Sequence, residues 1–268
     1  MNAQDTTPDN VPIIIVGAAG RMGSTIRGLV TAGEGFSLAG LVDRPEFRAG
    51  LETFGVPVAD RLDALLPKVQ GVVVDFTAPE VSLASARAVA ATGHSLVVGT
   101  TGLSPEQREE LAALAKRAPI FWSSNMSVGV NVLLKMLPAL ARTLGDAYDI
   151  EIVEIHHGRK KDSPSGTALT LGECLAGARE WNLPDVRCSG RNGIIGERPK
   201  LQIGVQAVRG GDVTGIHTVY FLGPGERIEV SHHAHSRENF AQGALRAARW
   251  MCGRAPGRLH SMQDCLEG

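Results

Sequence analysis

One short stretch carries most of the side chains that could do chemistry. Residues 156–161 read His-His-Gly-Arg-Lys-Lys, so two histidines and three cations stand within six positions. Such a cluster favours an anionic ligand, while histidine and lysine can supply a proton near neutral pH. Ser165-Gly166-Thr167 follows and is typical of a helix start, where backbone N–H groups bind a carboxylate or phosphate. The stretch therefore predicts an anion site beside a proton donor.

A second stretch is rich in glycine. Residues 17–23 read Gly-Ala-Ala-Gly-Arg-Met-Gly, with Ala19 in place of the middle glycine of the strict dinucleotide pattern. Glycines let the backbone approach a pyrophosphate, and the following helix offers N–H donors. Asp43 stands twenty residues after Gly23, where a ribose ligand is expected. Asp43 favours NADH, while Arg44 leaves NADPH open because a guanidinium can meet a 2′-phosphate.

Two further loops follow apolar strands. Gly99-Thr100-Thr101-Gly102 comes after the run 95–98, and Ser123-Ser124-Asn125-Met126 comes after the run 120–122. Ligands of open α/β sheets bind at the carboxyl ends of the strands. Small residues in these loops would let a nicotinamide ring approach, and Asn125 could bond its carboxamide. Ordinary turn chemistry is the alternative interpretation.

The elements that must position these residues fall into two groups. Up to about residue 126, buried apolar runs alternate with helical segments, which predicts a Rossmann-like, doubly wound parallel sheet. Residues 127–236 contain long helices and several strand-like runs separated by short turns such as Gly-Pro-Gly-Glu, which predict an α+β domain with a mixed or antiparallel sheet. We expect residues 237–268, with a helix over 239–251, to return to the first domain.

Bulk composition narrows the class of protein. The 268 residues carry a formal net charge of −1, which predicts no strong attraction to nucleic acid or to an anionic membrane. No apolar run is expected to reach the length that spans a bilayer, and the polar first ten residues are expected to be a frayed tail. The four cysteines form no C-x-x-C pair, which favours free thiols and a cytoplasmic location.

A metal site is not expected. The paired histidines at 156 and 157 have no acidic or cysteine partner at ligand spacing, and the second cluster, His232, His233 and His235, is a weak match to a zinc site. The role of this second cluster stays open between structural and substrate-adjacent.

Long motifs make the chain resemble the dihydrodipicolinate reductases, also called 4-hydroxy-tetrahydrodipicolinate reductases. The resemblance runs from Val11 to Met251, and its central motif, EIHHGRKKDSPSGTA at Glu154 to Ala168, is the most specific. The other matching motifs are GAAGRMG, DFTAPE, VVGTTG, NMSVGVN, VRGGDVTGIHTV and GERIEVSHHAHSR.

This resemblance implies hydride transfer from NADH or NADPH to a cyclic, unsaturated dicarboxylate of lysine biosynthesis, by a homotetramer. It implies His156 as general acid/base, Lys160 as proton donor, His157 as a substrate contact, and Gly166 with Thr167 as the carboxylate site. The cofactor contacts that it implies are Gly17, Ala18, Ala19, Gly20, Arg21, Met22, Asp43, Arg44, Gly99, Thr100, Thr101, Ser123, Ser124, Asn125 and Met126.

Two alternatives remain. The first is a dehydrogenase of another amino-acid intermediate with a similar two-domain plan. The second is a dinucleotide sensor without catalysis, which would have no need of the dense cationic loop.

Overall fold

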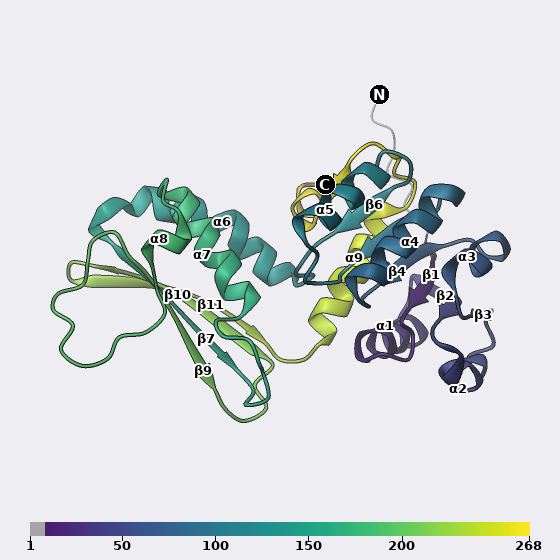
Figure 1. Cartoon of the computed structure of the whole chain (residues 1–268), viewed down its shortest axis with the longest axis horizontal. Coiled ribbons are helices and arrows are strands. Elements are labelled where there is room, and N and C mark those ends of the chain that lie inside the picture. The colour runs from purple at the N-terminus through teal and green to yellow at the C-terminus, as the bar shows by residue number, and fades with distance from the viewer. Residues whose placement is uncertain (1–8) are drawn as a thin grey trace. The chain divides into compact units, whose positions relative to one another are not determined.

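The computed structural model describes residues 9–268, and the expected polar tail lies almost entirely outside them. The chain divides into two compact units (Figure 1). Unit 1 comprises the chain up to Val128 together with Arg237–Gly268, and unit 2 comprises Gly129–Ser236.

Unit 1 is built on a parallel sheet of seven strands in the order β12-β6-β5-β4-β1-β2-β3. The direction of winding reverses between β1 and β4, which is the switch point of a Rossmann-like sheet. The strands are β1 (Val11–Val16), β2 (Phe36–Val42), β3 (Val58–Ala59), β4 (Val72–Asp75), β5 (Leu96–Val98), β6 (Ile120–Trp122) and β12 (Leu259–His260).

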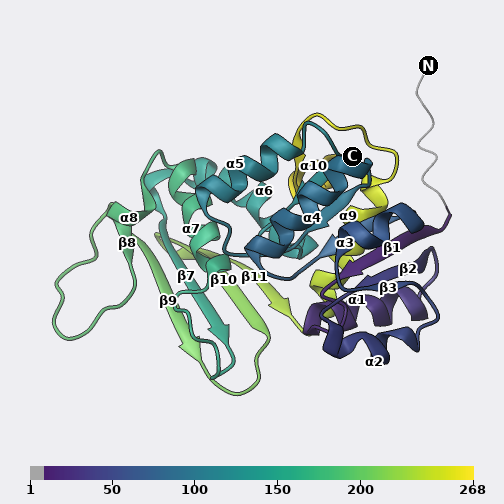
Figure 2. The same cartoon turned by 45° about the vertical axis from the view of Figure 1, so that its right-hand side comes forward.

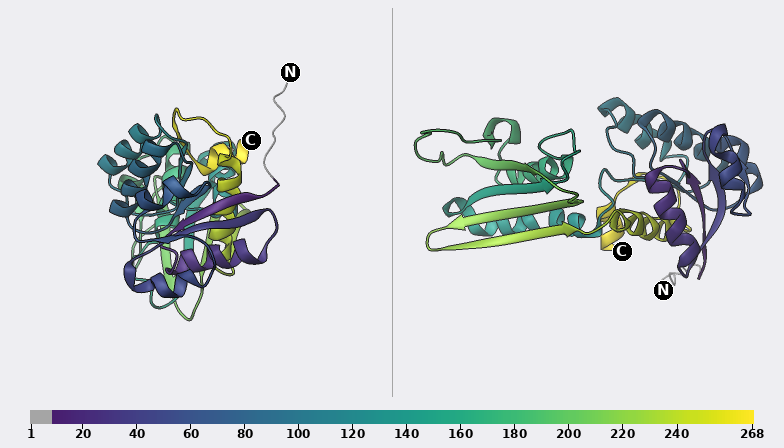
Figure 3. Two further views of the ribbon diagram at one scale, coloured as in Figure 1. Left: turned by 90° about the vertical axis from the view of Figure 1, so that its right-hand side faces the viewer. Right: turned by 90° about the horizontal axis from the view of Figure 1, so that it is seen from below.

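Helices cover both faces of this sheet (Figure 3). Ile13 and Ile15 of β1 pack with α1 and α9 on one face, whereas Ile14 and Val16 pack with α3, α4 and α5 on the other. Because both faces are buried, β1 is apolar at every position. The helices of unit 1 are α1 (Arg21–Ala32), α2 (Arg48–Glu52), α3 (Leu62–Leu65), α4 (Pro79–Thr92), α5 (Pro105–Leu114), α9 (Glu238–Met251) and α10 (Met262–Glu267).

Unit 2 contains a mixed sheet of five strands in the order β11-β10-β7-β9-β8. Strand β10 pairs antiparallel with β7 and β11, whereas β9 runs parallel to β7 and β8. The strands are β7 (Asp149–His156), β8 (Arg187–Cys188), β9 (Ile203–Arg209), β10 (Gly215–Gly223) and β11 (Glu226–Ala234), and the helices are α6 (Val128–Leu144), α7 (Gly166–Ala178) and α8 (Leu183–Val186).

The helices of unit 2 gather on one face of its sheet (Figure 2). Ile150 and Ile152 of β7 pack into one cluster with Leu137 of α6 and Leu171 of α7. Alternate residues of the same strands face away from this cluster. The core of unit 2 therefore lies between the sheet and α6 and α7.

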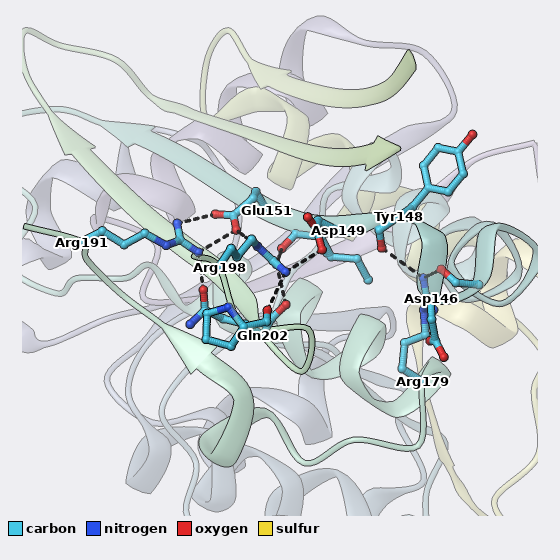
Figure 4. A network of polar contacts seen from close by, with 11 residues as sticks. Asp146, Tyr148, Asp149, Glu151, Arg179, Arg191, Arg198 and Gln202 are labelled. Carbon is cyan, nitrogen blue, oxygen red and sulfur yellow. Dashed lines mark hydrogen bonds and ion pairs between the residues drawn. The ribbon is translucent and has the colours of Figure 1, made fainter. Parts of the chain in front are cut away.

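A long loop joins β8 to β9, and two arginines tie it to β7 (Figure 4). Arg191 donates to both carboxylate oxygens of Glu151, at 2.9 and 2.8 Å. Arg198 donates to Asp149 at 2.7 Å and to Glu151 at 3.0 Å. The bidentate contacts restrain both ends of a loop whose middle is exposed.

The observed architecture confirms the predicted fold class. The strands β3, β8 and β12 and the short helices α2, α3, α8 and α10 were not predicted, because segments of two to six residues show no periodicity. Helix α5 begins with a capping box, in which Ser104 and Gln107 are bonded reciprocally.

One expectation about apolar runs is wrong. The stretch Val128–Ala147, 20 residues long with a mean hydropathy of 1.2 over an 18-residue window, is long and apolar enough to cross a membrane by length and composition alone. Lys135, Pro138 and Arg142 interrupt it, so the stretch is not a continuous apolar run in the sequence. Its helix, α6, contributes Leu137 and Ala141 to the core of unit 2.

Candidate functional site

The ends of five parallel strands in unit 1 lie in one row. Val16 is paired with both Val42 and Asp75, and Val98 is paired with Asp75 and Trp122. Because these residues end their strands, the loops that follow meet at one edge of the sheet, across the switch point. The structure thereby gathers all the sequence-predicted cofactor residues, which lie in the loops after β1, β2, β5 and β6 and in the first turn of α1.

At two positions of the glycine loop, Gly17 and Gly23, the neighbouring atoms leave no room for a side chain. Gly17 has a φ of 73°, and a Cβ there would lie 2.6 Å from Cγ2 of Thr77. A Cβ on Gly23 would lie 2.1 Å from the carbonyl oxygen of Gly17. Helix α1 starts directly after Gly20 and has no side-chain cap. This exposed helix start and glycine cradle fit the pyrophosphate of a dinucleotide.

Asp43 lies beside this loop. Its carboxylate accepts from the backbone N–H of Ala19 at 2.7 Å and from that of Arg44 at 2.8 Å. Arg44 is exposed, forms an ion pair with Glu46 at 3.1 Å, and lies 5.0 Å from the ring centre of Phe47. Asp43 is thus held next to the glycine loop, where a ribose ligand is expected, and Arg44 stays accessible to solvent.

The other two predicted loops are tightly packed. A Cβ on Gly99 would lie 2.2 Å from the ring of Phe76. Thr100 is buried, accepting a hydrogen bond from Ser82 at 2.7 Å, while Thr101 is exposed.

In the loop after β6, the side chain of Asn125 accepts from the backbone N–H of Ser127 at 2.8 Å. Ser123 donates to the carbonyl oxygen of Asn125 at 2.7 Å, Ser124 is exposed and Met126 is buried. These contacts hold the loop backbone at the sheet edge.

A cavity of about 740 Å³ opens at the carboxyl ends of β1 and β2. Val16 and Val42 form its floor, and the small side chains of Ala84 and Ala88 on α4 leave room for it. The residues of α4 that line this cavity were not predicted as site residues from the sequence. The run of small residues on α4 is the feature of the sequence that could have indicated them. A cavity of this size lies in the range of small-molecule binding sites.

Of the two predicted catalytic residues, His156 ends β7 on the helix-covered face of the sheet, and Lys160 lies in the loop that follows. Glu154 and His156 alternate on β7, so both side chains point to that face. Strand pairing places His217 of β10 opposite Glu154, and Arg209 of β9 opposite His156. Glu154, Arg209 and His217 were not predicted as site residues, although the alternation along β7 links Glu154 to His156 in the sequence.

Glu154 is a fully buried acceptor for three partners. Arg209 donates to both of its oxygens at 2.7 Å, His156 Nδ1 lies 2.6 Å from Oε2, and the Ser165 N–H donates to Oε1 at 2.9 Å. Burial raises the pKa of Glu154, but Arg209 and His156 outweigh that effect, so the pKa is lowered. Burial lowers the pKa of His156, against the opposing effect of Glu154. Glu154 is therefore an anion at neutral pH.

His217 joins His156 to the helix start. The two imidazole rings meet edge to face at 5.1 Å, and His217 Nε2 lies 3.0 Å from Ser165 Oγ. Burial, reinforced by His156, lowers the pKa of His217 to about 4. His217 is thus a neutral neighbour of His156.

The rest of the predicted anion site surrounds this cluster. Lys160 forms an ion pair with Asp162 at 2.8 Å, and the backbone of His157 is tied to Val213 at 2.8 Å. Ser165 is the N-cap of α7 and accepts from the N–H of Ala168 at 3.1 Å, so Gly166 and Thr167 form the first turn. The first-turn N–H groups of a helix have no intrahelical partners and can bind an anion.

The glycine loop at the switch point of the Rossmann-like sheet in unit 1 and the histidine with its cationic loop in unit 2 are features expected of a nicotinamide-dinucleotide oxidoreductase. The family models "Dihydrodipicolinate reductase, N-terminus" and "Dihydrodipicolinate reductase, C-terminus" match residues 11–126 and 129–266. The chain belongs to the dihydrodipicolinate reductase family.

Curated relatives agree with this assignment, and one solved structure shares the fold. The 4-hydroxy-tetrahydrodipicolinate reductase of Desulfovibrio desulfuricans is 68% identical over 94% of this chain and 98% of its own length. The one from Nitratidesulfovibrio vulgaris (strain DP4) is 60% identical over 95% and 99%. A dipicolinate-bound dihydrodipicolinate reductase from Paenisporosarcina sp. TG-14 shares the fold, with a TM-score of 0.74, 22% identity and coverage of 95% and 98%.

Proposed function

We propose that this protein reduces 4-hydroxy-tetrahydrodipicolinate, a cyclic unsaturated dicarboxylate, to tetrahydrodipicolinate with NADH or NADPH, in lysine and diaminopimelate biosynthesis. The proposal rests on one observation in unit 2. His156 contacts His217, and His217 contacts Ser165 at the start of α7, so the histidine at the head of the cationic loop lies beside the start of a helix. The names of the relatives support the substrate.

The reduction needs one hydride and one proton. The reduced nicotinamide, when bound, supplies the hydride. We assign proton transfer to Lys160 and His156, with His157 as a substrate contact. One substrate carboxylate binds the first-turn N–H groups of Gly166 and Thr167 beside Ser165, because the helix start favours negative charge.

In unit 1 we assign the pyrophosphate to residues 17–22 and the adenosine ribose to Asp43. We assign the nicotinamide side to Gly99, Thr100 and Thr101 and to residues 123–126. Both cofactors are proposed to bind, because Asp43 suits a free ribose hydroxyl and the exposed Arg44 suits a 2′-phosphate.

A steady-state assay tests the proposal. Purified protein should oxidise NADH or NADPH only when freshly generated cyclic dicarboxylate is present. Turnover of homoserine- or aspartate-type intermediates in a substrate panel would favour another dehydrogenase, and cofactor binding without any turnover would favour a sensor. Running both cofactors in parallel measures the preference.

We further propose a cytoplasmic homotetramer that associates through unit 2. All four cysteines are free thiols, as expected in a reducing compartment. Ile194 on the β8–β9 loop is fully exposed, and Ile195 and Leu201 on the same loop are also exposed. A restrained loop that presents apolar side chains to solvent is typical of a protein–protein contact.

A further inference from the structure

We propose that Glu154 is a positioning residue, one buried carboxylate that sets which nitrogen of His156 carries the proton and also holds the start of the anion-binding helix. This inference rests on the proposed function, since it assigns a role in the same site. The two tasks belong to different oxygens of the same group, and they can be separated by substitution.

The first task follows from the chemistry of a carboxylate. An ionised carboxylate only accepts hydrogen bonds, and Oε2 lies 2.6 Å from His156 Nδ1. Neutral His156 therefore carries its proton on Nδ1, and Nε2 keeps its lone pair. Nε2 lies next to Gly215, where a Cβ would approach it to 3.0 Å. The nitrogen that exchanges protons is thus Nε2, on the side of the ring away from Glu154.

The second task follows from the contact with Ser165. Oε1 accepts the Ser165 N–H at 2.9 Å, and Ser165 caps α7 through its side chain. Glu154 thereby ties the N-cap of α7 to the strand that carries His156. A shift of this carboxylate would move the first turn of α7, where we place a substrate carboxylate.

Arg209 makes the arrangement selective for a carboxylate. Its two terminal nitrogens donate to both oxygens of Glu154, and one of them also donates to the carbonyl oxygen of Asp162 at 2.8 Å. A glutamine at position 154 would place an NH₂ group against Arg209 in either orientation. At Oε1 that group would meet two donors, Arg209 and Ser165, whereas at Oε2 it would meet Arg209 and His156.

The amide therefore takes the Oε2 position in Glu154→Gln and donates to His156 Nδ1. His156 must then move its proton to Nε2, the opposite tautomer. Imidazole ¹⁵N NMR of the full-length protein reads this directly, with His156→Gln used to assign the signal. In the unaltered protein we expect neutral His156 as the Nδ1–H tautomer, and in Glu154→Gln as the Nε2–H tautomer, with kcat lowered about 10²-fold.

The interpretation of the NMR signals must account for every titratable or charged group around His156. The charged groups are Glu154, Lys160 and Arg209, and the neutral group is His217. Asp162 acts through its ion pair with Lys160.

Two further variants separate positioning from folding. Glu154→Asp keeps the charge, so the Nδ1–H tautomer should persist, while the shorter side chain loosens Ser165 and raises KM for the dicarboxylate more than it lowers kcat. Glu151→Gln removes an ion-paired carboxylate from the opposite face of the same strand and should leave the His156 signals unchanged.

An Nε2–H tautomer in the unaltered protein would overturn the inference, and that measurement needs no variant. It would also be overturned if Glu154→Gln kept both the Nδ1–H tautomer and the parental kcat. Absence of turnover in the unaltered enzyme would reject the proposed function instead, because the tautomer is read without substrate.

Discussion

At the scale of the residue, His156 and Lys160 are the proposed proton-transfer groups. Replacing either with alanine should lower kcat by about 10²–10⁴-fold, because a positioned proton donor contributes a factor of that size. NADH affinity, measured by fluorescence titration, should be retained since both residues lie in unit 2. Lys116→Ala, an exposed lysine of unit 1, is the control for loss of charge. Variants of both positions with near-parental kcat would refute the assignment.

The lowered pKa of His217 makes the free energy of unfolding depend on pH. Burial lowers its pKa in the folded state from the ordinary value of 6.5 to about 4, so the unfolded chain binds its proton first as pH falls. Stability is therefore lost as pH drops below about 6.5 towards 4, by about 2 kcal/mol at pH 5 relative to pH 7.

The substitution His217→Gln removes this titration. Denaturant unfolding at pH 7 and pH 5 should show a smaller loss of stability for the variant than for the parent. An equal loss would mean that another group, such as the half-buried His232, carries the effect.

At the scale of the element, the close contact between α1 and the glycine loop should tolerate no side chain. Gly23→Ala places a methyl group 2.1 Å from a backbone oxygen that cannot rotate away. We expect a loss of about 1–3 kcal/mol in stability and weaker binding of NADH, measured by denaturant unfolding and by titration.

Gly28 provides the matched control in the same helix. A Cβ there would meet nothing within 4 Å, so Gly28→Ala should stabilise the protein by up to about 1 kcal/mol. If both variants behaved alike, helix propensity rather than the loop contact would explain the result.

Sequence patterns located the longer elements well and the shorter ones poorly. The apolar run 11–16 coincides with β1, and the cap at Ser165 begins α7 as expected. The two-residue strands β3, β8 and β12 depend on pairing with neighbours in the sheet. No local pattern encodes that pairing, so the sequence alone could not reveal them.

At the scale of the whole molecule, the proposed tetramer depends on the loop between β8 and β9. Ile195→Asp should shift the protein towards smaller species in sedimentation velocity, because burying a charge in an apolar contact is costly. Met136→Asp, on the exposed side of α6, should leave the assembly unchanged. A parent protein that sediments as a monomer at micromolar concentration would contradict the proposal.

The sequence by itself determined the class of chemistry and the type of fold. Glycine spacing, the cationic stretch 156–161 and the alternation of apolar runs are local features, and local features are readable from one chain. Only the tertiary structure placed Glu154, Arg209 and His217 around His156, because their proximity depends on the register of β7, β9 and β10. Strand register depends on packing across the whole sheet, and it decides which charges meet a histidine.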